Sequence, residues 1–232
     1  MAVEPETYVG KGLYTVRDVS RLARTSSQNI RRWIDGYVTR RNGRSIRHEP
    51  VLCSDYGRVE NELVLSFLDL MQVRMVLAFK EYGVSLQEIR KAAIRAAEVL
   101  NDPHPFATER LYTDGRRVLA EITGEGRDPD LITLSQRQYE IHEVVIPLLY
   151  KGVEFNRESI AMRWWPHGTE SPVVVDPDRN FGRPTVASCG VPAEILAQQV
   201  SVIGSIESVA SWYEVSQDEV RAALDFERDF AA

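Results

Sequence analysis

Cysteine is scarce in this sequence of 232 residues, which contains only Cys53 and Cys189. Such a low count excludes a disulfide-stabilised secreted domain and favours a reducing compartment. No apolar run approaches the roughly 18 to 20 residues that a membrane-spanning helix needs. The first ten residues are polar and include two acids. We therefore expect no secretory signal, no membrane partner and a cytoplasmic location.

Patterns that carry enzyme chemistry are also lacking. The four histidines share no metal-ligand spacing with one another or with the two cysteines. Two short glycine pairs, Gly10-x-Gly12 and Gly124-x-Gly126, do not extend into a nucleotide-binding fingerprint. No Gly-x-Ser-x-Gly nucleophile elbow is present. The sequence thus predicts a protein that is not an enzyme, with no cofactor and no metal. The histidines are His48, His104, His142 and His167.

Charge is present in abundance but is unevenly distributed. The chain is 44% hydrophobic and 27% charged, as in folded globular proteins, and its net charge is −6. Residues 10–58 hold 11 basic and 4 acidic residues, whereas residues 126–232 hold 9 basic and 17 acidic ones. A basic first part and an acidic last part indicate two surfaces for two partners, one of them a polyanion. An ordinary solvated charged surface is the alternative.

Residues 15–47 carry the pattern of a winged helix-turn-helix. Thr15 and Asp18 open a short helix, and Ser26-Ser27 offers the N-cap of a second helix that Gly36 closes. A basic hairpin around Asn42-Gly43 follows, as a wing would, although an arginine-rich surface loop would look similar. We expect base contacts from the second helix and phosphate contacts from the arginines. The predicted DNA-binding residues are Ser26, Ser27, Gln28, Asn29, Arg31, Arg32, Arg40, Arg41, Arg44 and Arg47.

Residues 62–82 are apolar on nearly every side, which predicts one helix buried within a domain or between subunits. Ser85 and Glu88 form a capping box for a further helix over residues 86–100. A single two-helix DNA reader contacts few bases, so we expect a homodimer. These two helices are the candidates for its seam, and a role in the core of one subunit is the alternative.

The remainder of the chain reads as short elements. We predict a β-hairpin over 112–119, a boundary loop over 124–130, strands over 132–134 and 160–165, a helix over 136–150, and helices over 192–203, 206–213 and 216–229. The predicted fold class is mainly α with short β-hairpins (α+β). Residues 1–125 would form the DNA-binding domain, and residues 126–232 a second, small helical domain.

Two blocks of the first domain resemble the MerR-type winged helix-turn-helix. The first is Tyr14-Thr15-Val16, then Ser26, then the string Asn29-Ile30-Arg31-Arg32-Trp33, and the second is YGVSLQEIR at 82–90. Arg24 stands where that family usually has a glycine in the turn. Pro103 and Pro105 interrupt the long dimer helix of MerR regulators. The resemblance implies a MerR-like DNA-binding module without the metal- or drug-sensing architecture.

Residues 173–226 resemble the DUF433 domain of bacterial antitoxins. The matching motifs are Asp176-Pro177, Gly182-Arg183-Pro184, Val191-Pro192 and Val220-x-x-Ala223-Leu224. Gly190 replaces an arginine of that family's pattern. The order of the two blocks is similar to that of two-domain VapB-type antitoxins of mycobacteria. This resemblance implies an antitoxin that binds a PIN-like ribonuclease toxin and operator DNA, and so represses its own operon.

A PIN-like toxin has a basic RNA groove, which an acidic partner can block. An arginine that displaces the toxin's metal is the other mechanism. The predicted toxin-binding residues are Asp218, Glu219, Arg221, Asp225, Phe226 and Arg228. The competing functions are a ligand-responsive MerR-like transcription regulator, which a deep apolar pocket in 126–232 would favour, and an adaptor without DNA binding.

Overall fold

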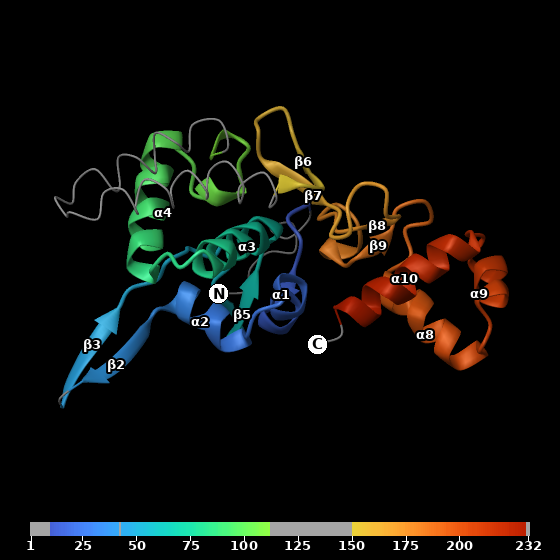
Figure 1. Ribbon diagram of the computed structural model, residues 1–232, viewed down its shortest axis with the longest axis horizontal. Coiled ribbons are helices and arrows are strands. Elements are labelled where there is room, and N and C mark those ends of the chain that lie inside the picture. The colour runs from blue at the N-terminus through green and yellow to red at the C-terminus, as the bar shows by residue number, and fades with distance from the viewer. Residues whose placement is uncertain (1–9, 42, 112–149, 231–232) are drawn as a thin grey trace. The chain divides into compact units, whose positions relative to one another are not determined.

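The computed structural model describes residues 10–41, 43–111 and 150–230 (Figure 1). They form two compact units, which are treated separately below. The N-terminal unit contains residues from 15 to 111 together with 150–151 and 155–161. The C-terminal unit contains residues 10–14, 152–154 and 162–230. The predicted hairpin over 112–119, the boundary at 125, the strand over 132–134 and all but the last residue of the helix over 136–150 lie outside the described residues.

Helices dominate both units, and the strands are short and paired in antiparallel fashion, which confirms the predicted α+β class. Among the described residues, no helix has both the length and the apolar character needed to cross a membrane. The elements up to residue 107 are β1 (Tyr14–Thr15), α1 (Val16–Ala23), α2 (Ser27–Asp35), β2 (Tyr37–Arg41), β3 (Arg44–His48), β4 (Arg58–Val59), β5 (Glu62–Leu65), α3 (Phe67–Glu81), α4 (Leu86–Leu100) and the 3₁₀ turn η2 (Pro105–Ala107).

Local capping defines the helix-turn-helix formed by α1 and α2. The Thr15 hydroxyl accepts the Asp18 N–H while the Asp18 carboxylate accepts the Thr15 N–H, so α1 begins at Val16. Arg24 ends α1 in the left-handed conformation, with φ of 53°. The Ser26 hydroxyl accepts the Asn29 N–H and caps α2. The two helices pack through Val19, Leu22, Ile30, Trp33 and Ile34, all of them buried. The predicted helix-turn-helix is confirmed.

Gly36 turns the chain from α2 into the β2–β3 ribbon. Its φ is +73°, and a Cβ at this position would collide with the carbonyl oxygen of His48. Only glycine fits both the conformation and the close approach. The ribbon therefore leaves α2 at a fixed point, in the place where the sequence predicts a wing.

The prediction of a single helix over 62–82 is wrong at its start. Residues 62–65 form β5, which pairs with β4 in the register Arg58↔Leu63. The Ser66 hydroxyl accepts the Asp69 N–H and the Asp69 carboxylate accepts the Ser66 N–H. Because of this capping box, α3 begins at Phe67. Helix α3 is buried on most sides within its own unit and packs against α1, α4 and η2. It forms the N-terminal core, which was the alternative to a dimer seam.

The C-terminal unit is a small assembly around three helices. Its elements, with the β6–β7 pair at which the chain passes between the units, are β6 (Val153–Phe155), β7 (Ala161–Trp164), β8 (Val173–Val174), the 3₁₀ turn η4 (Asn180–Gly182), β9 (Thr185–Val186), α8 (Ala193–Ile203), α9 (Ile206–Tyr213) and α10 (Gln217–Asp229). The strand predicted over 160–165 and the helices predicted over 192–203, 206–213 and 216–229 are confirmed to within one residue at each end. Helix α10 packs against α8 and α9.

The DUF433-like motif residues serve structural roles in this unit. Asp176 is buried, and its carboxylate accepts hydrogen bonds from the Arg163 guanidinium at 2.8 Å and from the Asp178 N–H at 3.0 Å. Gly182 has φ of +85° and its carbonyl accepts the Tyr14 hydroxyl at 2.9 Å. A Cβ at Gly182 would collide with that hydroxyl. These contacts tie residues 10–14 to the loop after β8.

Candidate nucleic-acid interface

The outward face of α2 carries the residues predicted to read bases. Ile30, Trp33 and Ile34 point into the core, so Gln28, Arg31 and Arg32 lie on the opposite, exposed face. Ser27 is half-buried at the start of the helix. Gln28 and Arg31 have the amide and guanidinium groups that pair with base edges in a major groove.

Two other residues of the predicted set, Ser26 and Asn29, form hydrogen bonds within the turn before α2. The Ser26 hydroxyl accepts the Asn29 N–H at 3.2 Å, and the Asn29 side-chain amide donates to the Thr25 hydroxyl at 3.3 Å. These bonds hold the turn and cap α2. The Ser26 O–H still has a hydrogen to donate, whereas half-buried Asn29 has part of its amide engaged.

The β2–β3 ribbon presents three of the predicted arginines, Arg40, Arg41 and Arg44, at its exposed end. Its register pairs Arg41 with Arg44 and Arg40 with Ser45, and all four residues are exposed. Arg47 lies 3.4 Å from the Glu49 carboxylate in an exposed ion pair. Within the described part of the chain, no acidic side chain forms an ion pair with Arg40, Arg41 or Arg44. Like charges directly opposite in a sheet destabilise it, which favours a polyanion as the partner of this end.

Aromatic stacking orients the ribbon against α2. The rings of Tyr37 and His48 stack at 4.3 Å with an angle of 11° between their planes. The Thr39 hydroxyl lies 3.0 Å from His48 Nε2, which adds a cross-strand bond. The Arg32 guanidinium carbon lies 5.5 Å from the centre of the Tyr37 ring. This cation–π contact holds Arg32, on the reading face of α2, beside the base of the ribbon.

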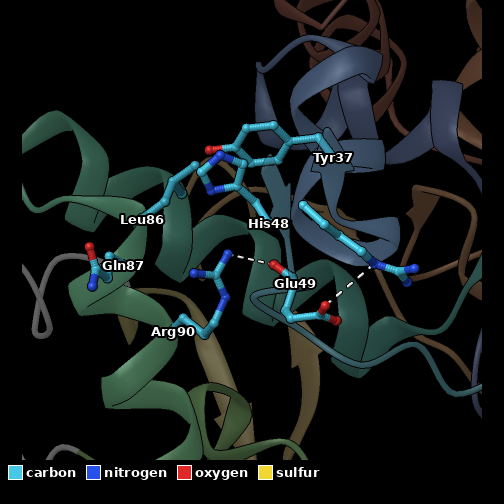
Figure 2. A pocket seen from close by; sticks show the side chains of 7 residues that line it. Tyr37, His48, Glu49, Leu86, Gln87 and Arg90 are labelled. Carbon is cyan, nitrogen blue, oxygen red and sulfur yellow. Dashed lines mark hydrogen bonds and ion pairs between the residues drawn. The ribbon is translucent and has the colours of Figure 1, made fainter. Parts of the chain in front are cut away.

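A cavity of about 480 Å³ opens between the base of the ribbon and the start of α4 (Figure 2). The Arg90 guanidinium donates to the carbonyl oxygens of Glu49 and Pro50 and so ties α4 to the segment after the ribbon. The cavity is open to solvent and belongs to the N-terminal unit, so it is not a pocket within residues 126–232 of the kind that would favour metabolite sensing there. The lining residues are Tyr37, Arg47, His48, Glu49, Leu86, Gln87 and Arg90.

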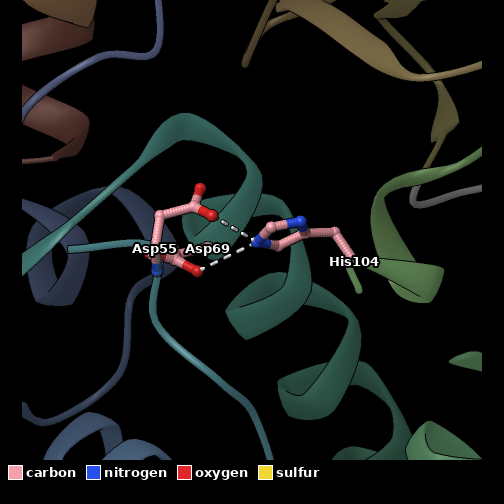
Figure 3. A group of neighbouring side chains, drawn as sticks. All are labelled: Asp55, Asp69 and His104. Carbon is pink, nitrogen blue, oxygen red and sulfur yellow. Dashed lines mark hydrogen bonds and ion pairs between the residues drawn. The ribbon is translucent and has the colours of Figure 1, made fainter. Parts of the chain in front are cut away.

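Sequence reasoning missed one cluster of titratable side chains, formed by Asp55, Asp69 and His104 (Figure 3). His104 Nε2 lies 3.1 Å from a carboxylate oxygen of Asp55 and 3.6 Å from Asp69 Oδ1. Burial alone would lower the pKa of His104, but the nearby carboxylates of Asp55 and Asp69 outweigh it and raise the pKa to about 9. Their separation in the sequence offered no signal, except that Ser66 and Asp69 have capping-box spacing.

The predicted toxin-binding residues all lie on α10, but they differ in exposure. Asp218 pairs with Arg221 at 2.7 Å and Asp225 with Arg228 at 2.8 Å, so both arginines are engaged by acids of their own helix. Hydrogen bonds from the Ser188 hydroxyl and the Ser216 N–H lower the pKa of Glu219, which caps the helix. The Phe226 side chain is fully buried and stacks on Phe230 at 4.5 Å, so it completes the core and does not lie at the surface.

Comparisons with known proteins agree with this N-terminal geometry. Residues 12–94 match a family model described as "Putative DNA-binding HTH domain". The chain is 29% identical over 223 residues to the "Putative antitoxin VapB45" of Mycobacterium tuberculosis, with 92% of each sequence covered. The crystal structure of Rv2018 from Mycobacterium tuberculosis is also similar, with a TM-score of 0.69 and 26% identity over 91% of this chain and 97% of that one. The N-terminal unit thus contains a helix-turn-helix of the DNA-binding kind, while the likenesses to MerR regulators and to DUF433 stay predictions.

Proposed function

We propose that the protein is a DNA-binding antitoxin, which binds operator DNA through α2 and the β2–β3 ribbon and neutralises a PIN-like ribonuclease toxin through its acidic part. By occupying the operator, it represses its own operon. The observation that carries the DNA half of this proposal is the exposed end of the ribbon, where Arg41 and Arg44 face each other and no acidic side chain in the described part of the chain pairs with them. Similarity to an antitoxin over nearly the whole chain supports the toxin half.

In the DNA complex, Gln28 and Arg31 contact base edges from α2, with Ser27 at the start of the helix. The arginines of the ribbon and Arg32 hold phosphates on either side. Residues 1–125 form the DNA-binding domain in this proposal. Two copies bind as a homodimer, because one α2 contacts too few base pairs for tight specificity and a second half-site lies about 34 Å away. Exposed Ile94 on α4 is available for the seam, with 57% of its surface accessible.

The toxin half rests on residues 126–232. The part from 162 to 232 contains 11 acidic and 5 basic residues, which suits a basic RNA groove. Arg221 and Arg228 are already paired on α10, so groove blocking is favoured over insertion of an arginine into the toxin's metal site. Trp212 on α9 is 74% exposed and supplies the apolar anchor for which buried Phe226 is not available.

A mobility-shift assay on the DNA upstream of the gene tests the first half. The double variant Arg31→Ala/Arg44→Ala should flatten the slope of log K against log salt concentration by about 0.9, because Arg44 holds one phosphate, and it should reduce the preference for operator over non-specific DNA, because Arg31 contacts a base. The matched control Lys151→Ala/Arg157→Ala removes the same charge from exposed positions outside α2, the ribbon and α4 and should leave the slope unchanged. Equal slopes in wild type and Arg31→Ala/Arg44→Ala would refute this placement.

Co-expression with the neighbouring gene product, followed by size exclusion and an RNA-cleavage assay, tests the second half. Trp212→Ala should weaken toxin binding by about 30-fold, as expected for an aromatic hot spot, with operator binding retained. Tyr82→Ala removes an exposed aromatic side chain from the N-terminal unit and serves as the control. Operator binding by a chain that neither binds nor inhibits the neighbouring gene product would favour the ligand-responsive regulator instead.

A further inference from the structure

The cluster of Asp55, Asp69 and His104 lies where three segments of the N-terminal unit meet (Figure 3). Asp55 belongs to the segment between β3 and β4, Asp69 to the first turn of α3, and His104 to the turn before η2. The Asp69 side chain is completely buried, whereas a quarter of the Asp55 side chain is exposed. Among the histidine, cysteine, aspartate and glutamate side chains of the described residues, these three form the group in which one possible metal-ligand atom from each lies within 4.8 Å of the others.

The two oxygens of the Asp69 carboxylate have different surroundings. Oδ2 accepts the Ser66 N–H at 2.9 Å and the Asp55 N–H at 3.2 Å, with the Ser54 hydroxyl at 3.4 Å. These donors fix the orientation of the carboxylate, as second-shell partners do for metal-binding carboxylates. Oδ1 is fully buried, has no hydrogen-bond donor, and points at His104 Nε2.

His104 alone cannot donate a hydrogen bond to both carboxylates. Nε2 carries at most one hydrogen, and Asp55 at 3.1 Å is the nearer acceptor. One hydrogen therefore serves two carboxylates, and Asp69 Oδ1 is left without a donor. Gln72, one turn after Asp69 on α3, is a second buried residue with an unpartnered atom, Nε2.

From this geometry we infer that Asp55, Asp69 and His104 form a binding site for a divalent transition-metal ion. Ligand atoms held about 2.0 to 2.2 Å from a tetrahedral zinc ion lie roughly 3.3 to 3.6 Å apart, close to the observed 3.1 and 3.6 Å. The ion binds both carboxylates at once and neutralises them. One imidazole nitrogen with two carboxylates suits zinc or a similar ion better than calcium or magnesium, which prefer oxygen alone. The exposed side of Asp55 admits the ion and a water as fourth ligand.

Such an ion links the segment between β3 and β4, which contains Asp55, to α3, which contains Asp69. Along that segment, the N–H groups of Val51 and Leu52 donate to the carbonyl oxygen of Trp33 near the end of α2. Asp55 follows three residues later. Metal binding therefore stabilises the connection between the cluster and the end of α2, and it does so independently of DNA or toxin.

Metal titration of the full-length chain, stripped with a chelator and dialysed, tests this inference. Co²⁺ is added first, because its visible absorption reports coordination, and Zn²⁺ is then added in competition and in calorimetry. We expect saturation at one ion per chain, displacement of Co²⁺ by Zn²⁺, and a higher melting temperature with zinc. Asp55→Asn should weaken binding at least about tenfold, and His104→Gln should do the same.

The control is His167→Gln, since His167 lies 3.5 Å from the single carboxylate of Asp229. It should bind Co²⁺ as wild type does. Asp55 is partly exposed, so Asp55→Asn is expected to fold, and circular dichroism checks this even if His104→Gln does not fold. Absence of saturable binding, or wild-type affinity in folded Asp55→Asn, would overturn the proposal and leave the cluster as an ion pair network only.

Discussion

Charge reversal at one position of the ribbon should stabilise the protein while it weakens DNA binding. Arg41 and Arg44 are direct partners in the β2–β3 register, and both are exposed. Two unit charges about 6 Å apart in water repel by about 0.7 kcal/mol. Arg44→Glu replaces this repulsion with an attraction of the same size, a change of about 1.4 kcal/mol before losses. Side-chain entropy and salt screening reduce it, so about 0.5 to 1 kcal/mol should be measured at low ionic strength.

Native-state hydrogen exchange of the β2 and β3 amides measures this change, because the ribbon can open without global unfolding. Exchange should slow by about two- to fivefold in 10 mM salt, and the difference should vanish near 1 M salt. In the mobility-shift assay, the same variant should flatten the salt slope by at least about 0.9. Arg157→Glu, an equal reversal at an exposed position outside α2, the ribbon and α4, should alter neither quantity.

Opposite signs of the two effects are the signature of a site selected for a polyanion. A variant that loses both ribbon protection and DNA affinity would show that Arg44 stabilises the ribbon, and the reasoning would fail. If amide exchange slows but DNA affinity is unchanged, Arg41 and Arg44 do repel each other in the ribbon, but the ribbon does not contact DNA.

Three further predictions address the two units separately. Gln28→Ala should relax preference at one operator base pair, worth about 1 to 3 kcal/mol, while the salt slope stays unchanged in competition assays. Glu219→Gln should lower the stability of the protein at neutral pH, measured by urea unfolding. Since the pKa of Glu219 is lowered, its contribution is present above the ordinary value of 4.5 and lost as the pH falls through the lowered value, so wild type and variant should converge there. Glu214→Gly should raise the melting temperature, because Glu214 ends α9 with φ of 55°, whereas Ser211→Gly within the helix should lower it.

The elements that could be predicted from sequence are those whose signals are local. Thr15 with Asp18 and Ser216 with Glu219 are capping boxes within four residues, and both start helices in the structure. Arg24 shows that the turn between α1 and α2 forms without the usual glycine, since a non-glycine residue accepts the left-handed conformation there. Packing of the two helices evidently outweighs the cost of that backbone conformation, which is about 1 to 2 kcal/mol.

The start of α3 was misjudged because apolar runs are ambiguous. A buried strand and a buried helix both read as continuous apolar residues, and Glu62–Leu65 with the following helix formed one such run. The capping box of Ser66 and Asp69 was present in the sequence but lay inside the run. Pairing of β5 with β4 decides the matter, and that contact depends on the turn at residues 60 and 61, both of which have positive φ.

The metal candidate could not be predicted, because its three residues come from segments that only the tertiary fold brings together. Asp69 gave a local signal for a cap, and that signal accounts for one carboxylate oxygen only. The second oxygen acquires its neighbours when the turn before η2 packs against α3 and α4. The Asp69 carboxylate therefore has a local role as a helix cap, which the sequence indicates, and a long-range role beside His104, which the sequence does not indicate.

The residues predicted to contact DNA fall into two groups, those that cap α2 and those whose polar groups are exposed. Serine and asparagine cap helices with the same groups that read bases, so the pattern around residues 26–29 could not separate the two uses. In the structure, Ser26 and Asn29 are engaged within the turn, whereas Gln28 and Arg31 have their polar groups exposed. Sequence discrimination should therefore reside in Gln28 and Arg31, and Ser26→Ala should reduce operator affinity only as far as it destabilises α2, equally for specific and non-specific DNA.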